Sequence, residues 1–253
     1  MTGPKAGETM TGSLAGKILL ISGAGSGIGR ASARRLHALG AALMLAGRRP
    51  GSLRETLPDA QAVVLDHADD AAVAAFARTC PDLDGMLLCA GELLTGSVEG
   101  SPLATFDRMI AANLRGPWLL CHHLGPRLRP GASVVLVGSN IGLRAIPDSA
   151  AYSVAKAGLH MLARVLALEW APRGIRCNAI APGPVHTAMV DSRMAGAGGD
   201  PAAALAALSR VNPLGRLGRE EEIAELAAHL LGDGSRWTTG AVIPIDGGAD
   251  AVM

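Results

Sequence analysis

The chain has 253 residues, of which 49% are hydrophobic and 18% are charged, and its formal net charge is +1. This composition is typical of a globular protein and argues against a disordered chain. The charges form no block of one sign, so we expect neither a nucleic acid nor an anionic membrane as a partner. Because no apolar run reaches about 18 residues, we expect no membrane-spanning helix.

The four cysteines indicate free buried thiols rather than a metal site. They form no CxxC pair and match no zinc-binding spacing. Free thiols persist in a reducing compartment, and the residues before Lys17 contain no apolar stretch typical of a signal peptide. We therefore expect a cytoplasmic protein that holds no metal. The cysteines are Cys80, Cys89, Cys121 and Cys177.

Seven short β-type segments alternate with segments of helical character along the chain. Most of the β-type segments are continuously apolar, as strands buried on both faces of a parallel sheet are. The alternation predicts a doubly wound, Rossmann-type α/β sandwich of three layers with about seven parallel strands, whose ligands bind at the carboxyl edge of the sheet. The predicted strands are residues 18–21, 42–45, 62–65, 86–89, 133–137, 176–180 and 242–245. The predicted helices are residues 29–39, 70–78, 103–124, 152–170 and 220–231.

The chain shows no internal repeat and no linker between domains. Residues 1–15 are rich in glycine and threonine and predict a flexible leader, which leaves residues 16–253 as a single domain. Residues 185–213 form a connection too long to be ordinary, which indicates either a lid or a disordered loop. We assign them as a lid, within which residues 201–208 have helical character.

A glycine-rich turn at residues 22–29 joins the first predicted strand to the first predicted helix. Gly23, Gly27 and Gly29 give the spacing GxxxGxG, with Ser26 and Ile28 between them, and the strict GxGxxG pattern is not met. Such a turn lets backbone N–H groups and a helix N-terminus approach a pyrophosphate. A plain strand-to-helix turn is the alternative, but the position between strand and helix favours dinucleotide binding.

The residues after the second and third predicted strands bear on the adenosine end of the cofactor. The acid that holds the ribose of NAD in many dinucleotide folds is absent, because the second strand runs into Ala46-Gly47-Arg48-Arg49. Arg48 suits the 2′-phosphate of NADP, so we favour NADP over NAD; solvated loop charges are the alternative. Asp66 is predicted either to bind the adenine amino group or to cap the next helix.

Tyr152, Lys156 and Ser139 form the candidate catalytic group. Tyr152 is the only tyrosine, and Lys156 follows it by four residues, so the two share one face of a helix. Ser139 lies 13 residues before Tyr152, just after the predicted strand 133–137. The strand end and the helix would bring the three side chains to the carboxyl edge of the sheet.

With these motifs in order, the chain resembles the short-chain dehydrogenase/reductase family over nearly its whole length. The resemblance also covers features between and beyond the three motifs. The matching features are residues 22–29, Asp66, Ala90-Gly91, Asn113, Ser139, Tyr152, Lys156, residues 178–183, Val185, Thr187 and residues 246–248. The sequence departs from the family pattern at Leu88-Cys89, where two asparagines are usual, and at Ser22, where threonine is usual.

The resemblance implies an oxidoreductase that moves hydride between NAD(P) and a secondary alcohol, ketone or 3-ketoacyl-type substrate. Tyr152 would act as general acid or base, Lys156 would favour its phenolate and bind the nicotinamide ribose, and Ser139 would hold the substrate oxygen. Asn113 would anchor a water in a proton path to solvent. Further cofactor contacts are implied for Ala90, Gly91, Pro182, Gly183, Val185 and Thr187. Substrate contacts are implied for Leu93, Asn140, Ile141, His186 and Met189.

The resemblance also implies a homotetramer that acts on a small molecule. One interface would use helices 103–124 and 152–170, and the other would use the last strand with helix 220–231. A cofactor-binding sensor or scaffold without turnover is the alternative function. Because Ser139, Tyr152 and Lys156 are all present, we favour the enzyme.

Overall fold

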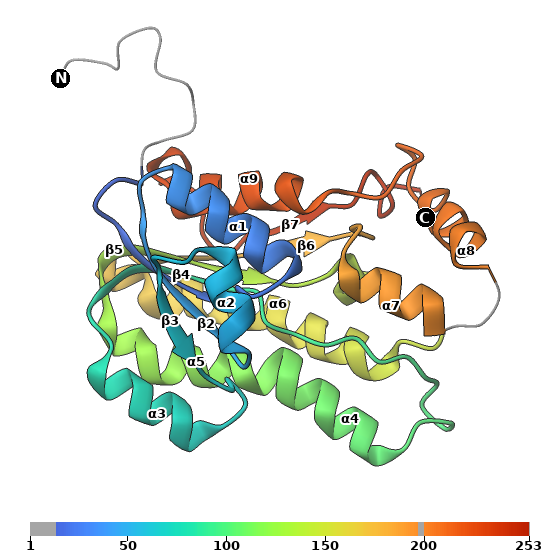
Figure 1. Ribbon diagram of the computed structural model, residues 1–253, viewed down its shortest axis with the longest axis horizontal. Helices are drawn as coiled ribbons and strands as arrows, with labels where there is room; N and C mark the ends of the chain where they lie inside the picture. Colours follow the sequence, from blue (N-terminus) through green and yellow to red (C-terminus); the bar gives the residue numbers. More distant parts are fainter. Residues whose placement is uncertain (1–13, 197–199, 253) are drawn as a thin grey trace, which may run out of the picture.

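The computed structural model describes residues 14–196 and 200–252, and its strands form one parallel sheet (Figure 1). Within the described residues the sheet has seven strands in the order β3-β2-β1-β4-β5-β6-β7. This confirms the predicted Rossmann-type fold with about seven parallel strands. The strands are β1 (Ile18–Ser22), β2 (Ala42–Gly47), β3 (Gln61–Val64), β4 (Leu83–Leu88), β5 (Leu128–Val137), β6 (Arg176–Pro182) and β7 (Val242–Ile245).

Helices cover both faces of the sheet, so each face has its own hydrophobic core. Alternate residues of β1 point to opposite faces: Leu20 packs with one cluster, whereas Leu19 and Ile21 pack with the other. The first cluster includes α3 (Asp70–Thr79), α5 (Gly116–Leu124) and α6 (Ala150–Trp170). The second includes α1 (Gly27–Ala38) and α9 (Glu220–Leu231). This two-sided burial explains why the strands read as continuous apolar runs.

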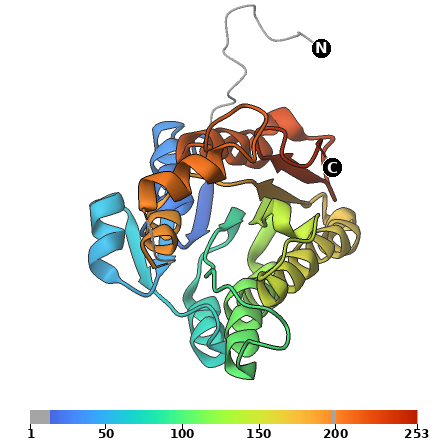
Figure 2. The same cartoon turned by 90° about the vertical axis from the view of Figure 1, so that its right-hand side faces the viewer.

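The strand order reverses beside β1, and this reversal creates the crevice in which Rossmann-type folds bind ligands. The chain passes from β1 to β2 on one side and later to β4 on the other. Two helices lie beyond the strand ends at that edge, α7 (Ala188–Gly196) and α8 (Pro201–Ser209), toward the right of Figure 1. Figure 2 looks onto the same side of the molecule, with α7 and α8 in front of the strands.

Two of the departures of local structure from the sequence expectations concern α2 (Pro50–Thr56) and the predicted helix 103–124. Helix α2 was not predicted; it begins with Pro50 at its first position, which is favourable for a helix start. The predicted helix 103–124 is divided into α4 (Leu103–Ile110), a π-helical turn (Ala111–Arg115) and α5. Such turns are common at functional sites, and this one carries Asn113.

The predicted leader and lid are only partly covered by the structure. Residues 1–13 and 197–199 lie outside the described residues. Leu14, at the end of the predicted leader, is fully buried, and its N–H donates to the Leu39 carbonyl oxygen at 2.9 Å. The predicted helical character of residues 201–208 is confirmed by α8, while the role of residues 185–213 as a lid stays a prediction. Among the described helices, none is long and apolar enough to cross a membrane.

Candidate active site

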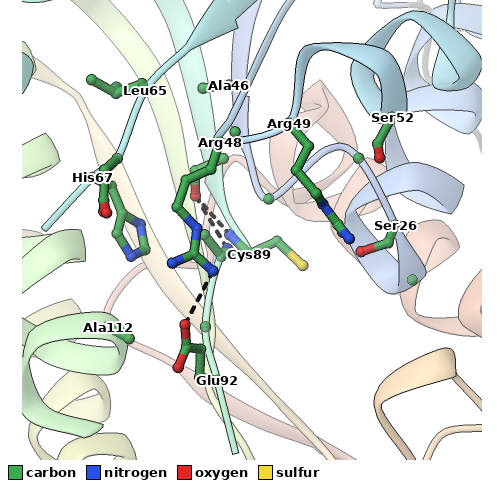
Figure 3. Close-up of a pocket in the computed structure, with 18 of the residues that line it drawn as sticks. Ser26, Ala46, Arg48, Arg49, Ser52, Leu65, His67, Cys89, Glu92 and Ala112 are labelled. Carbon is green, nitrogen blue, oxygen red and sulfur yellow. Dashed lines mark hydrogen bonds and ion pairs between the residues drawn. The ribbon is translucent and has the colours of Figure 1, made fainter. Parts of the chain in front are cut away.

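A cavity of about 720 Å³ opens at the carboxyl edge of the sheet, between the ends of β1, β2 and β4 (Figure 3). Most residues predicted from the sequence to bind the cofactor lie on its wall, together with one predicted substrate residue. These residues are Gly23, Ser26, Gly27, Ile28, Arg48, Asp66, Ala90, Gly91, Thr187 and Met189. The glycine turn and the arginine after β2 therefore face the same space, as the sequence analysis predicts.

The glycine turn has no room for larger side chains at two of its positions. Gly23 has φ +71°, and a Cβ atom there would lie 2.7 Å from the Cα atom of Ala90. A Cβ atom on Gly29 would lie 2.2 Å from the Gly23 carbonyl oxygen. The hydroxyl of Ser22 accepts the N–H groups of Cys89 and Ala90 at 3.1 and 3.2 Å. The turn is thus tied to the end of β4, and serine makes these bonds in place of the usual threonine.

These features fit a dinucleotide phosphate. Close backbone packing leaves N–H groups and the N-terminus of α1 at the cavity wall. Ser26 is the N-cap residue of α1, but its hydroxyl makes no capping hydrogen bond. A hydroxyl beside a helix N-terminus is a suitable donor to a phosphate oxygen.

The adenosine end of the cavity holds charges that the sequence analysis did not single out. Glu92 forms ion pairs with Arg48 at 3.1 Å and with Arg108 at 2.6 Å. Arg49 forms no ion pair within the part of the chain that the structure describes, and its side chain points toward Ser26 in Figure 3. Glu92 directly follows the Ala90-Gly91 motif, which is the sequence signal that would have brought it to notice.

Asp66 lies on the cavity wall, and its carboxylate accepts the N–H of Ala68 at 3.0 Å. The N-cap of α3 is Asp69, whose carboxylate accepts the N–H of Ala72 at 3.1 Å. The alternative that Asp66 caps the next helix is therefore wrong, because the chain makes one further turn before α3 begins. His67, a second unforeseen wall residue, has its pKa lowered by burial.

Lys156 lies deep at the end of β5. It is only 5% exposed, and its ammonium donates to the Val137 carbonyl oxygen at 2.9 Å. Burial lowers the pKa of Lys156 from 10.5 to about 8. The ammonium lies 5.5 Å from the centre of the Tyr152 ring, so α6 brings the two residues together as their spacing predicts.

Gly91 connects this pair to the cavity and to Asn113. A Cβ atom on Gly91 would lie 2.6 Å from Asn113 Oδ1 and 3.5 Å from Lys156 Nζ. The buried carboxamide of Asn113 donates to the carbonyl oxygens of Glu92 and Met109, at 2.9 and 3.1 Å, and accepts the Glu92 N–H at 3.2 Å. Asn113 thus fixes the chain that leads from the cavity wall to the substrate side.

Ser139 is 7% exposed and follows β5 after one residue, Gly138. Its hydroxyl accepts the N–H of Ile141 at 3.3 Å, which starts the short 3-10 turn Asn140–Gly142. Ser139, Asn113, Tyr152 and Lys156 are not on the cavity wall itself. Gly91, on the wall, packs closely against Asn113 and Lys156. Helix α6, which carries Lys156, also packs against the turn that contains Ser139.

Of the cofactor contacts predicted at and after the end of β6, Thr187 lies on the cavity wall, whereas Pro182, Gly183 and Val185 do not. The Gly183 N–H donates to the Ile245 carbonyl oxygen at 3.1 Å, directly after Pro182 ends β6. Val185 pairs with Gly218 in an isolated bridge. The hydroxyl of Thr187 accepts the N–H of Val190 at 3.3 Å, at the start of α7.

Four of the five predicted substrate residues do not lie on the cavity wall, namely Leu93, Asn140, Ile141 and His186. His186 is largely exposed and pairs with Asp191 at 3.0 Å. Asn140 is buried and interacts with the Asp250 carboxyl group near the C-terminus. Among the described residues, no cluster of histidine, cysteine, aspartate or glutamate side chains is suited to a metal ion. All four cysteines are free thiols.

Comparison with known proteins agrees with this geometry. The profile of a family described as enoyl-(acyl carrier protein) reductase matches residues 23–250. Levodione reductase of Leifsonia aquatica is 37% identical over 93% of this chain and 94% of its own length. The 2-keto-3-deoxy-L-fuconate dehydrogenase of Xanthomonas campestris is 32% identical over 93% of this chain and 80% of its own.

A crystal structure of levodione reductase superimposes with a TM-score of 0.88 and 35% identity, covering 94% of this chain and 99% of that one. The crystal structure of a putative short-chain dehydrogenase/reductase from Burkholderia xenovorans gives a TM-score of 0.91 at 30% identity, covering 96% of this chain and 99% of that one. The chain therefore belongs to the short-chain dehydrogenase/reductase family and is an NAD(P)-dependent oxidoreductase of alcohol and ketone groups.

Proposed function

We propose that this enzyme interconverts a ketone and a secondary alcohol with NADP as its preferred cofactor, and that Tyr152 is its general acid and base. The observation that carries the proposal is the buried Lys156 ammonium, 5.5 Å from the ring of Tyr152 and joined through Gly91 to a cavity of about 720 Å³. Such a cavity is large enough for a cofactor-sized ligand. The nicotinamide supplies or accepts hydride when it is bound.

The chain itself supplies binding, orientation and a proton. In reduction, Tyr152 Oη gives a proton to the carbonyl oxygen of the substrate; in oxidation it takes the proton back. Lys156 favours the phenolate by its positive charge and binds the ribose hydroxyls. Ser139 Oγ holds the substrate oxygen by a hydrogen bond. Asn113 anchors a water between Lys156 and solvent.

The proposed contacts combine residues of the cavity wall with residues that the family resemblance implies. The backbone of Gly23, Gly27 and Gly29, with Ser26 and Ile28, holds the pyrophosphate, and Asp66, Ala90 and Gly91 hold the adenosine. Pro182, Gly183, Val185 and Thr187 orient the nicotinamide. Leu93, Asn140, Ile141, His186 and Met189 form the substrate side, closed by residues 185–213 as a lid. The relatives named above act on carbonyl or hydroxyl compounds by their names, which supports a ketone, secondary alcohol or 3-ketoacyl substrate.

Two observations support NADP rather than NAD. First, β2 ends at Gly47 and runs into Arg48-Arg49, so the end of the strand carries no carboxylate of its own to bind the 2′-hydroxyl and repel a 2′-phosphate. Second, two arginines follow on the cavity wall: Arg48, which Glu92 holds, and Arg49, for which no ion pair is found among the described residues. We therefore extend the sequence prediction and assign the 2′-phosphate to Arg48 and Arg49 together.

The cofactor test is a fluorescence titration of NADPH and NADH with the wild type, Arg48→Ala and Arg49→Ala. A lost charge-assisted hydrogen bond of about 1.5–3 kcal/mol weakens NADPH binding about 10–100-fold, and NADH binding stays unchanged. Arg54→Ala is the matched control, because Arg54 lies on α2, the helix that follows Arg49, but not on the cavity wall. Equal affinities for NADPH and NADH in the wild type would refute the preference.

The catalytic test is Tyr152→Phe, followed as NADPH consumption with levodione as the first ketone. We expect loss of turnover with unchanged NADPH affinity, and no other phenol can replace Tyr152, since the chain has a single tyrosine. Full activity in this variant would refute the mechanism. NADPH binding without turnover of any alcohol or ketone by the wild type would instead favour the sensor or scaffold function.

We also propose that the enzyme is a homotetramer and that it works in a reducing, cytoplasmic compartment. Helix α6 exposes an apolar stripe of Val154, Met161, Val165 and Leu168, and α5 exposes Trp118. Trp237, just before β7, is also fully exposed. Exposed apolar patches of this kind mark protein interfaces. The residues of α5 and α6 lie on helices that the family resemblance assigns to one interface, and Trp237 lies in the connection that leads to β7, the strand assigned to the other. The free thiols support the compartment.

A further inference from the structure

A buried histidine that the proposed mechanism does not use lies directly behind Ser139. His160 is 4% exposed and stands on α6, four residues after Lys156 and eight after Tyr152. Residues at this spacing share one face of a helix. The face of α6 that carries the two predicted catalytic residues therefore continues into His160.

The imidazole ring of His160 fills the space between the two glycines that flank Ser139. A Cβ atom on Gly138 would lie 2.1 Å from His160 Nε2, and one on Gly142 would lie 2.8 Å from His160 Cε1. Neither position admits a side chain while the ring is present. The ring therefore decides how closely the turn after β5 approaches α6.

The same ring contacts the backbone of Ser139. The Ser139 N–H donates to His160 Nε2 at 3.5 Å, a long hydrogen bond. Nδ1 then carries the proton and faces the backbone of Gly142 without a well-aligned bond. Burial, reinforced by the nearby Lys156 charge, lowers the pKa of His160 to about 4, so Nε2 remains an acceptor at neutral pH.

We infer that His160 is a positioning residue, which holds the Ser139 turn at the correct distance from Tyr152 and Lys156. The inference rests on the proposed function, in which the Ser139 hydroxyl holds the substrate oxygen by a hydrogen bond. Lys156 provides a second contact of the same kind, from its ammonium to the Val137 carbonyl oxygen. The two contacts join one face of α6 to the end of β5 on either side of Gly138. His160 touches neither substrate nor cofactor, and it acts through Ser139 alone.

The kinetic test compares His160→Leu with His160→Gln on the ketone that the wild type reduces fastest. Leucine fills the space but accepts no hydrogen bond, whereas the glutamine carboxamide reaches about as far as Nε2 and can accept one. We expect His160→Leu to lower kcat about 10–100-fold, as misplacement of a catalytic group by about 1 Å does. The KM for NADPH should change less than about threefold, and His160→Gln should recover most of the lost kcat. Wild-type kcat in His160→Leu would overturn the inference.

A double-mutant cycle separates positioning from simple destabilisation. If His160 acts through Ser139, then Ser139→Ala and Ser139→Ala/His160→Leu should have the same kcat within about threefold. Additive losses would overturn the inference. Leu166→Ala on the core side of α6 is the control; it should lower the melting temperature and leave kcat per folded enzyme and the Ser139→Ala effect unchanged.

A spectroscopic measurement keeps the inference separate from the proposed function. In histidine labelled with ¹⁵N, His160 should show a proton on Nδ1 and an unprotonated Nε2 at pH 7, with no titration above about pH 5. The opposite tautomer, or titration near pH 6.5, would overturn the inference whatever the activity. Activity of Tyr152→Phe, by contrast, would overturn the proposed mechanism and leave this signal unchanged.

Discussion

Replacing Lys156 with methionine should increase stability most at neutral pH and abolish turnover. Methionine has nearly the length of lysine without its charge. Burial lowers the pKa of Lys156 from 10.5 to about 8, and the side chain is 5% exposed. At about 1.36 kcal/mol per pH unit, keeping the buried ammonium protonated costs about 3 kcal/mol. A trade-off of this kind, in which a functional group lowers the stability of the folded state, is common in enzymes.

The sign of the pH dependence follows from proton binding. Between pH 8 and 10.5 the unfolded chain still holds the lysine proton, whereas the folded chain has lost it, so the wild type gains stability as the pH rises. The stability advantage of Lys156→Met should therefore shrink by about 2–3 kcal/mol between pH 7 and pH 10. Loss of the hydrogen bond to the Val137 carbonyl oxygen adds an opposing offset of about 1–3 kcal/mol that does not vary with pH.

Urea unfolding of the cofactor-free protein at pH 7, 8, 9 and 10 measures this difference. A change of about 2–3 kcal/mol corresponds to roughly 4–12 °C in melting temperature for a chain of this size. Lys17→Met is the matched control, because the Lys17 ammonium lies near the surface beside Asp233 at 3.0 Å. A difference between wild type and Lys156→Met that stays constant from pH 7 to pH 10 would refute the argument that the ammonium is desolvated.

Three further predictions follow from the packing. Gly29→Ala should weaken NADPH binding more than tenfold in a fluorescence titration and lower the melting temperature, because its Cβ atom would lie 2.2 Å from the Gly23 carbonyl oxygen. Unchanged NADPH binding would contradict this close packing of Gly29 against Gly23. Iodoacetamide at pH 8 should leave Cys80, Cys121 and Cys177 of the native protein unmodified and should modify all four cysteines in urea, as counted by intact mass. These three side chains are buried, and burial raises the pKa of Cys121 to about 12, of Cys80 to about 11, and of Cys177 as well. Rapid native labelling of any of the three would contradict its burial. Leu168→Glu should reduce the proposed tetramer to a smaller species, as measured by light scattering, because Leu168 is 78% exposed on the apolar stripe of α6. A monomeric wild type would refute the proposed tetramer itself.

The fold and the central site motifs were predictable because they depend on local pattern. Apolar runs of four to six residues separated by helical segments require a parallel sheet covered on both faces. The glycine turn at residues 22–29 and the pair Tyr152/Lys156 are short-range patterns as well, since each lies within one element or one turn. Their positions in the chain therefore determined that they would meet at the carboxyl edge of the sheet.

Other features of the site depend on contacts between residues distant in sequence. Glu92 binds Arg48, which lies 44 residues earlier, and the Ser139 N–H meets His160, which lies 21 residues later. No local pattern marks either pair. The π-helical turn at Asn113 and the capping of α3 by Asp69 rather than Asp66 likewise depend on how neighbouring segments pack.

The sequence by itself thus determined the layers and the strand direction, and it was enough to propose the glycine turn as the phosphate site and Tyr152/Lys156 as the acid–base pair, because hydrophobic period and residue spacing are local properties. The tertiary structure alone decided which arginine keeps a carboxylate partner, how deeply Lys156 is buried and what stands behind Ser139. These properties depend on desolvation and on distances across the sheet edge, which are set only when β5, β4 and α6 pack together.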